Sequence, residues 1–103
     1  MKVFISQPMR GLDDDTILAV REKALNAVKE MYREEEIELI DSFFKDAPVD
    51  AKPLWYLGDS IRLLSEADLV VFVNGCEKDT RGCKIEYACA EAYEYKTLLI
   101  NID

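Results

Sequence analysis

Short apolar runs alternate along the chain with longer segments in which apolar residues recur every three or four positions. The short runs are rich in β-branched and aromatic residues, which is typical of buried strands. The longer segments have the spacing of amphipathic helices, and Pro53 opens the second of them. The predicted strands are residues 2–6, 36–41, 68–73 and 97–102. The predicted helices are residues 14–34, 53–64 and 82–93.

The same spacing predicts which side chains of each helix face the core. Asp13, Asp14 and Asp15 supply a cap and favourable charge at the start of the first helix. Residues 42–52, with Pro48, and the stretch "NGCEKDTRG" after the third strand are predicted loops. The side chains predicted to pack inward are Ile17, Leu18, Ala24, Leu25, Val28, Met31 and Tyr32, then Leu54, Leu57, Ile61 and Leu64, then Ile85, Ala88, Cys89 and Ala92.

The order of these elements predicts an α/β fold with a doubly wound, flavodoxin-like or Rossmann-like arrangement. Near-continuously apolar strands separated by amphipathic helices indicate a four-stranded parallel sheet that is covered on both faces. Right-handed crossovers favour the strand order 2-1-3-4. Ligands of such sheets bind beyond the carboxyl ends of the strands where the order reverses, which here lies between strands one and three. The loops "SQPMRG" and "NGCEKDTRG" are expected to meet there.

Length and charge narrow the class of protein. A chain of 103 residues predicts one domain, residues 1–103. The formal net charge of −8 disfavours binding to a nucleic acid polymer, because such binding depends on neutralising phosphates with Lys and Arg. The chain has neither a signal-peptide pattern nor an apolar run long enough to cross a bilayer. We therefore expect a cytoplasmic protein with no membrane association.

The chain contains no histidine, which changes the range of chemistry to consider. Its absence excludes Ser-His-Asp and Cys-His nucleophilic systems and histidine metal clusters. Cys76, Cys83 and Cys89 are odd in number and lack CxxC spacing, so reduced thiols are expected and no metal site is indicated. If the protein is an enzyme, carboxylates are expected to perform its chemistry, without a metal or organic cofactor.

Two sites in the predicted crevice carry candidate chemistry. Glu86 lies about one turn into the third helix, where the helix dipole favours an ionised carboxylate suited to a nucleophile or base. The alternative is that Glu86 only stabilises the start of the helix. Arg10 and Gly11 together can grip a phosphate or carboxylate, or Arg10 can instead pair with the aspartates that follow. Neither GxGxxG nor GxxxxGK[ST] is present.

Other side chains can reach the same crevice. Asp79 precedes Glu86, and Asp59 lies on the second helix with Ser60. Paired carboxylates suit a glycosidic centre, where one attacks the anomeric carbon and another manages the leaving group, although each acid can also be a solvated charge or a cap. Trp55 and the neighbouring Tyr56 can stack on a nucleobase or simply pack.

Two motifs carry a resemblance to a known superfamily. "MKVFISQPMRG" and "EADLVVFVNGCEKDTRGCKIEYACAEA" resemble nucleoside 2-deoxyribosyltransferases and deoxynucleotide N-hydrolases. The whole chain is similar to a family of small phage and bacterial proteins of unassigned function within that superfamily. The resemblance implies the same fold, a nucleoside or nucleotide as the small-molecule partner, and a homodimer or higher homo-oligomer.

The resemblance also implies roles for individual residues. Gly82 and Glu86 match a G-x-x-x-E motif whose glutamate is the nucleophile, and Met9-Arg10-Gly11 matches a loop that holds a 5′-phosphate. Two aspartates of the enzymes fall on Ser60 and Thr80 here, with Asp59 and Asp79 each one residue earlier. The expected catalytic residues are Glu86, Asp79 and Asp59. The expected substrate-binding residues are Ser6, Gln7, Met9, Arg10, Gly11, Ser60, Asn74 and Gly82.

These observations leave two classes of function open. The leading hypothesis is an enzyme that processes an N-glycosidic bond, as a hydrolase if water is the acceptor and as a transferase if another base is. The alternative is a nucleotide-binding, regulatory or phage accessory module that keeps the crevice without turnover.

Overall fold

A four-stranded parallel sheet forms the centre of the protein. The computed structural model describes residues 1–43 and 47–102. The order of the strands is β2-β1-β3-β4, and all three strand pairs are parallel, as the sequence predicts. The strands are β1 (Lys2–Ser6), β2 (Glu38–Leu39), β3 (Leu69–Val73) and β4 (Thr97–Ile100).

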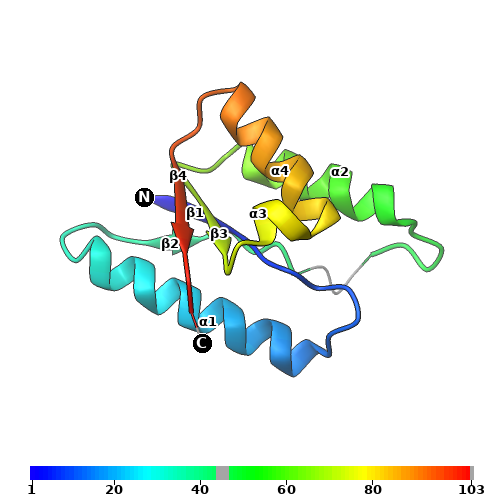
Figure 1. Cartoon of the computed structure of the whole chain (residues 1–103), viewed down its shortest axis with the longest axis horizontal. Helices are drawn as coiled ribbons and strands as arrows, with labels where there is room; N and C mark the ends of the chain where they lie inside the picture. The colour runs from blue at the N-terminus through cyan, green and yellow to red at the C-terminus, as the bar shows by residue number, and fades with distance from the viewer. Residues whose placement is uncertain (44–46, 103) are drawn as a thin grey trace.

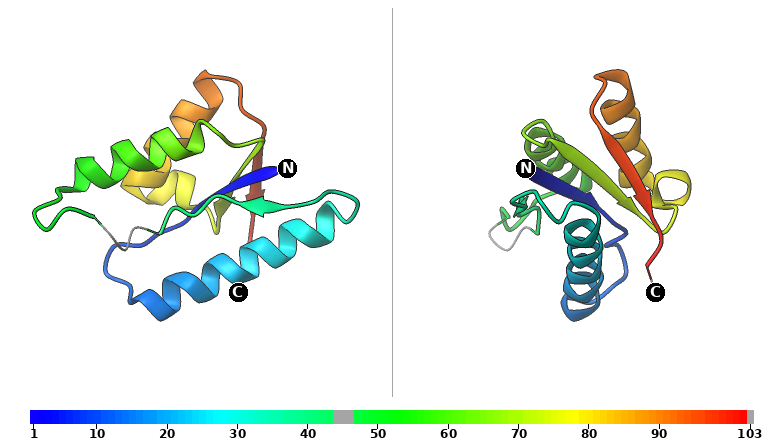
Figure 2. Two further views of the ribbon diagram at one scale, coloured as in Figure 1. Left: turned by 180° about the vertical axis from the view of Figure 1, so that it is seen from behind. Right: turned by 90° about the vertical axis from the view of Figure 1, so that its left-hand side faces the viewer.

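Helices cover both faces of this sheet. The chain moves from β1 to β2 in one direction across the sheet and from β2 through β3 to β4 in the other, so right-handed crossovers place the helices on opposite faces. The first helix lies on one face, with the second and fourth on the other (Figures 1 and 2). The doubly wound prediction is confirmed. The helices are α1 (Asp14–Met31), α2 (Pro53–Leu64), α3 (Cys76–Asp79) and α4 (Arg81–Ala92).

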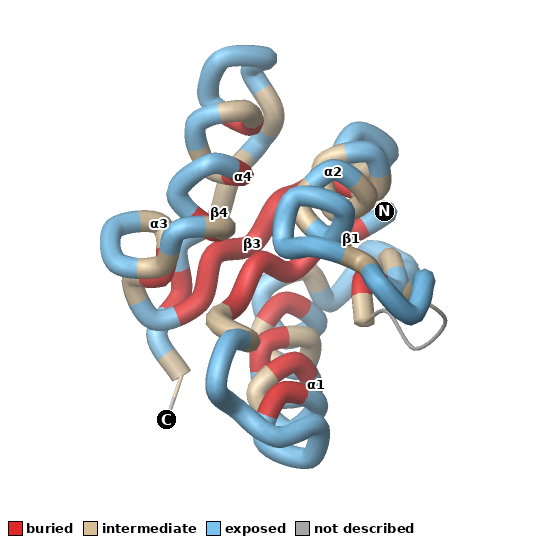
Figure 3. Tube along the Cα trace, turned by 90° about the vertical axis from the view of Figure 1, so that its right-hand side faces the viewer, coloured by how far each residue is buried: buried red, intermediate tan, exposed pale blue. Residues whose placement is uncertain are grey.

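The alternation of side chains along the strands divides the core into two layers. Val3 and Ile5 of β1 pack with the inner side of α1, whereas Phe4 between them packs with residues of α2, α3 and α4. Strand β3 is buried along its whole length, and the buried positions of α1 form a stripe that faces the sheet (Figure 3). This division assigns Ser6, two residues after Phe4, to the α2 and α4 side.

Several predicted boundaries differ from those in the structure. Strand β2 has two residues rather than six, although Ile40 N still donates to Val3 O at 2.8 Å just beyond it. Helix α1 ends at Met31 instead of residue 34, because Tyr32 leaves the helical region with φ −121°. The predicted loop after β3 contains the one-turn helix α3. Within the predicted loop 42–52, residues 44–46 lie outside the described residues.

The predicted inner face of the last helix is wrong. Ile85, Ala88 and Ala92 of α4 are exposed and Cys89 is half-buried. The helix instead buries Cys83, Glu86 and Ala90, and Tyr87 beside them meets Phe72 of the sheet edge-on, with ring centroids 5.1 Å apart. Apolar residues occur on two sides of this helix. The prediction from apolar spacing selected the side with Ile85, whereas the buried side is the one that contains Glu86.

The other two helices show smaller errors of the same kind. In α1, Ile17, Ala24 and Val28 are buried as predicted, but Leu18 and Met31 are exposed. In α2, the Leu64 side chain is buried and Leu57 and Ile61 are half-buried, whereas Leu54 is 77% exposed. Leu54 lies in the first turn of α2, and this turn lies beyond the carboxyl ends of the strands (Figure 2).

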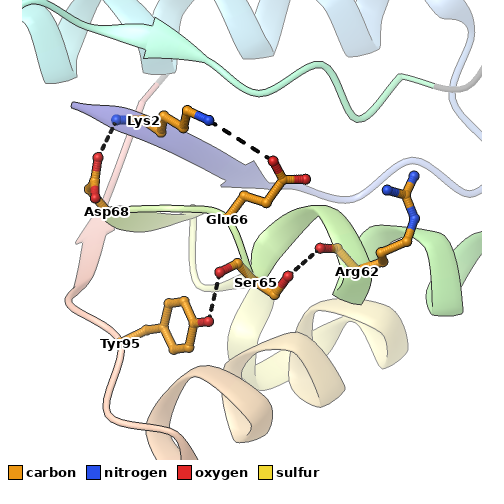
Figure 4. Close-up of polar contacts among 6 residues, drawn as sticks. All are labelled: Lys2, Arg62, Ser65, Glu66, Asp68 and Tyr95. Carbon is orange, nitrogen blue, oxygen red and sulfur yellow. Dashed lines mark hydrogen bonds and ion pairs between the residues drawn. The ribbon is translucent and has the colours of Figure 1, made fainter.

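Polar contacts join the elements at the amino ends of the strands, away from the ends where ligands bind in this class of sheet. Lys2 N donates to Asp68 Oδ2 at 2.7 Å, and the Tyr95 hydroxyl donates to Ser65 O at 2.8 Å (Figure 4). Lys2 Nζ lies 4.0 Å from Glu66 Oε1 in an exposed pair that contributes little. None of the helices in residues 1–43 and 47–102 is long and apolar enough to cross a membrane.

Candidate functional site

A cavity of about 810 Å³ opens at the carboxyl end of β1, where the strand order reverses. Its wall includes the chain after β1, the side of α2, and the first turn of α4. This volume lies within the range of small-molecule sites, roughly 300–1,000 Å³. The predicted crevice therefore exists, and its walls include parts of both predicted loops. Eight of the eleven predicted catalytic and substrate-binding residues line it: Ser6, Gln7, Met9, Arg10, Ser60, Asp79, Gly82 and Glu86.

Glu86 is a buried acid in the cavity wall. It is the sixth residue of α4 and only 7% exposed, and it lies on the face of the helix that packs against the sheet. Ser6, the last residue of β1, donates from its hydroxyl to Glu86 Oε1 at 2.6 Å. This short bond joins residues that are 80 positions apart in the chain. It directs one carboxylate oxygen at the strand end.

The protonation of Glu86 depends on opposing effects. Burial raises the pKa of Glu86 above its ordinary value, because the charged form loses water. Hydrogen bonds from Ser6 and Ser60 and the positive charge of Arg21 act in the opposite direction. The sequence led us to expect the helix dipole to favour the charged form, but Glu86 lies beyond the first turn and burial is the largest effect. Charge on Glu86 therefore depends on its three neighbours.

Arg21 is the functional candidate that the sequence analysis missed. It lies on α1 and is only 5% exposed, although arginine is seldom buried. Its Nε donates to Gln7 Oε1 at 2.8 Å, and Gln7 Nε2 donates to Ile17 O at 2.9 Å. The signal was present in the spacing: residue 21 falls between Ile17 and Ala24 on the buried stripe of α1.

The two acidic partners expected of Glu86 have different placements. Asp79 ends α3 and lines the cavity. Asp59 is bound on α2 by Arg62, with Nη2 2.7 Å from Oδ1, and is not among the described residues that line the cavity. Ser60, the next residue, lines the cavity, and its hydroxyl lowers the pKa of Glu86. A turn of about 100° per residue along the helix explains why only one of these two neighbours reaches the site.

Two other predicted binding residues are also not among the described residues that line the cavity. Asn74 accepts a hydrogen bond from Ile102 N at its Oδ1, at 2.6 Å, and has φ 53°. Its side chain therefore ties the end of β3 to the chain after β4. Gly11 follows Arg10 with φ 79°, a conformation that glycine adopts without strain. Gly11 therefore lets the chain turn just after the cavity wall.

Further residues line the cavity that the sequence did not identify as binding residues. Tyr56, which the sequence offered as either a stacking or a packing residue, is one of the lining side chains, together with Phe43 from the segment after β2. These rings give the cavity an aromatic side. Arg81 and Thr80 line it at the start of α4. Both belong to the loop "NGCEKDTRG" that was expected at this crevice, although neither was predicted to bind substrate.

Two thiols adjoin the same strand end. The Cys76 thiol donates to Ser6 O at 3.4 Å. Cys83 lines the cavity, and its contact with Cys76 together with burial raises the pKa of the Cys83 thiol. The cysteines at 76, 83 and 89 are all free thiols. The same contact with Cys83 lowers the pKa of the Cys76 thiol, and Glu86 is the buried carboxyl group at this point.

Comparison with protein-family models gives no match, and a search of curated proteins finds no match either. The superfamily resemblance therefore stays a prediction from the two motifs. The geometry shows a buried carboxyl group, held by hydroxyls, in the wall of a cavity with both aromatic and charged sides. Such a group can act as a nucleophile, act as a base, or bind a polar group of a ligand.

Proposed function

We propose that this protein breaks or exchanges the N-glycosidic bond of a deoxynucleoside or a deoxynucleoside 5′-monophosphate, with Glu86 as the nucleophile. The observation that carries the proposal is the placement of Glu86: a 7%-exposed carboxyl group in the wall of a large cavity, bound by Ser6 Oγ at 2.6 Å. Burying an acid is unfavourable, and a purely structural helix acid has no need of it. The motif resemblance supplies the substrate class.

The reaction balances with groups that line the cavity. The Glu86 carboxylate forms a bond to C1′ of the sugar while the bond from C1′ to the base nitrogen breaks, and the electron pair leaves with the base. Asp79, which lines the cavity as Asp14 also does, can give the departing base its proton. Water, or the nitrogen of a second base, then attacks C1′ and releases the Glu86 carboxylate, and its proton returns to Asp79.

The rest of the cavity suits the two ends of a nucleotide. Phe43 and Tyr56 offer aromatic surface on which a base can stack. Arg10, which lies just beyond β1, can bind a 5′-phosphate by forked hydrogen bonds. Arg81 at the start of α4 is a second cation in the same wall and competes for this role.

The experiment is to incubate the protein with a panel of deoxynucleosides and their 5′-monophosphates and to measure the free base by chromatography. We expect at least one substrate to release its base, and Glu86→Gln to abolish the release. Glu22→Gln, at an exposed position of α1, removes the same charge and should leave the rate unchanged. Adding a second base and looking for a new nucleoside separates transferase from hydrolase.

Base release that persists in Glu86→Gln would contradict the role of Glu86 as the nucleophile. Binding measured by calorimetry with no release from any substrate would favour the other class, a nucleotide-binding or accessory module. The alternative is supported by the position of Asp59, which lies one residue before the position of the aspartate in the similar enzymes and is paired with Arg62. The enzyme is favoured because Ser60 occupies the position facing Glu86 and can hold it in place.

A homodimer or higher homo-oligomer and a cytoplasmic location also remain proposals from the sequence. Light scattering of the purified chain measures the first: a mass of about one chain, 11.8 kDa, would contradict it.

A further inference from the structure

Arg21 is a cation that the proposed chemistry does not yet use. Its Nη1 and Nη2 are buried, and across residues 1–43 and 47–102 neither has a hydrogen-bond partner. Burial lowers the pKa of this guanidinium, whereas the acids Asp41 and Glu86 raise it, and arginine stays charged even when buried. A methionine of similar length would avoid this cost. An arginine on the buried stripe of α1 is explained if its positive charge has a role of its own.

The hydrogen bonds of Arg21 lead toward Glu86. The Gln7 amide is held on both sides by α1, because its oxygen accepts from Arg21 Nε at 2.8 Å and its nitrogen donates to Ile17 O at 2.9 Å. Gln7 directly follows Ser6, whose hydroxyl bonds Glu86 at 2.6 Å. Helix α1 therefore fixes the strand end that presents the donor to the carboxylate.

We propose that Arg21 is a positioning residue for Glu86: its bond to Gln7 holds Ser6 in place, and its buried guanidinium supplies a positive charge on the α1 side of the carboxyl group. This inference rests on the proposed function, since it assigns the control of the same nucleophile. Arg21 itself is not among the described residues that line the cavity, so it acts through Glu86 and not on the substrate.

Arg21 is the charged neighbour of Glu86, although the hydrogen bonds from Ser6 and Ser60 lower the pKa of Glu86 more than the charge of Arg21 does. Ser6 and Ser60 donate hydrogen bonds but carry no charge, and they oppose only part of the effect of burial. Arg21 is the cation whose field reaches the carboxylate, and it also faces Asp41. The groups around Glu86 are Ser6 from β1, Ser60 from α2, Arg21 from α1 and Cys83 from α4. Of these four groups, Arg21 is the one that carries a positive charge.

The test is to follow the side-chain carboxyl ¹³C signal of Glu86 by NMR as a function of pH. The variants are Arg21→Met, which removes the charge, and Arg21→Lys, which keeps it. Lys29→Met, at an exposed position of the same helix, is the matched control for net charge. We expect the titration midpoint to move to higher pH in Arg21→Met, to move little in Arg21→Lys, and to stay at the wild-type value in Lys29→Met.

In the active enzyme the same change has a kinetic counterpart. The acid limb of the pH profile should move to higher pH in Arg21→Met, so that base release falls on the acid limb while the rate on the high-pH plateau stays within about threefold of the wild type. A merely structural Arg21 would lower the melting temperature without moving this limb.

An unchanged Glu86 midpoint in folded Arg21→Met overturns the proposal. If Arg21→Met does not fold, Arg21→Gln removes the charge while keeping a donor for Gln7, and the same midpoint decides. The NMR measurement needs no substrate, so it judges Arg21 even if the wild-type protein releases no base. Base release judges the proposed function separately.

Discussion

Replacing Glu86 by glutamine should stabilise the protein at neutral and alkaline pH. The pKa of Glu86 is raised in the folded state by burial, so the folded protein binds this proton more tightly than the unfolded chain does. The free energy of unfolding of the wild type therefore falls as pH rises from the unfolded-state pKa, about 4.3, through the folded pKa. Glutamine does not titrate and escapes this loss.

The magnitude follows from the same linkage. Each unit by which the folded pKa exceeds the unfolded one removes about 1.4 kcal/mol of stability at higher pH. The glutamine amide oxygen can still accept from Ser6, and the Ser60 hydroxyl can accept from the new amide nitrogen. We expect the free energy of unfolding of Glu86→Gln to exceed that of the wild type at pH 8, by about 1.4 kcal/mol for each unit of that difference, and to match it at acid pH, where Glu86 is protonated in both states.

Urea titrations followed by circular dichroism between pH 4 and pH 8 measure this difference. The slope of the free energy against urea should stay the same, so that midpoints report stability. Glu22→Gln at its exposed position should show no such rise with pH. If Glu86→Gln were instead less stable by the same amount at every pH, the carboxylate would be a structural group, and the functional argument from its burial would fail.

Two further predictions concern the phosphate and the core. Arg10→Ala should weaken binding of a deoxynucleoside 5′-monophosphate about tenfold, as measured by calorimetry. Binding of the nucleoside should stay unchanged, because only the phosphate contacts the guanidinium. If Arg81→Ala causes that loss and Arg10→Ala does not, the phosphate lies at the start of α4. Val71→Ala should lower the free energy of unfolding by about 2–3 kcal/mol in urea denaturation, because Val71 in the middle of β3 is fully buried. Val49→Ala, at a fully exposed position, should lower it by less than about 0.5 kcal/mol. Equal losses for the two variants would contradict the burial of Val71.

The parallel sheet could be predicted from the sequence because its signals are local. Runs such as Leu69–Val73 are apolar at every position, which is what a strand buried on both faces requires. The alternation of these runs with helical segments, combined with the handedness of crossovers, was sufficient to give the order β2-β1-β3-β4. The position of the cavity followed from that order. These features depend on periodicity and connection rules that hold along the chain.

The inner faces of the helices were less accessible to sequence reasoning. Helix α4 has apolar residues on two sides, and the side with Ile85 was predicted to be buried. In the structure the other side of α4 is buried, because Tyr87 and Cys83 pack in the same cluster as Phe72. Periodicity measures how apolar a face is, whereas packing depends on the shape of the sheet surface opposite, and that surface comes from other segments.

The sequence by itself determined the fold class and the strand order, and it predicted Glu86 and the loop after β1 as parts of a site. Only the tertiary structure decided which partners Glu86 has. It brought Ser6 and Ser60 to the carboxylate, left Asp59 with Arg62, and buried Arg21 behind Gln7. The physical reason is that periodicity and capping act between near neighbours, whereas a buried charge is balanced through space by groups far apart in the chain, such as Ser6 and Glu86, 80 positions apart.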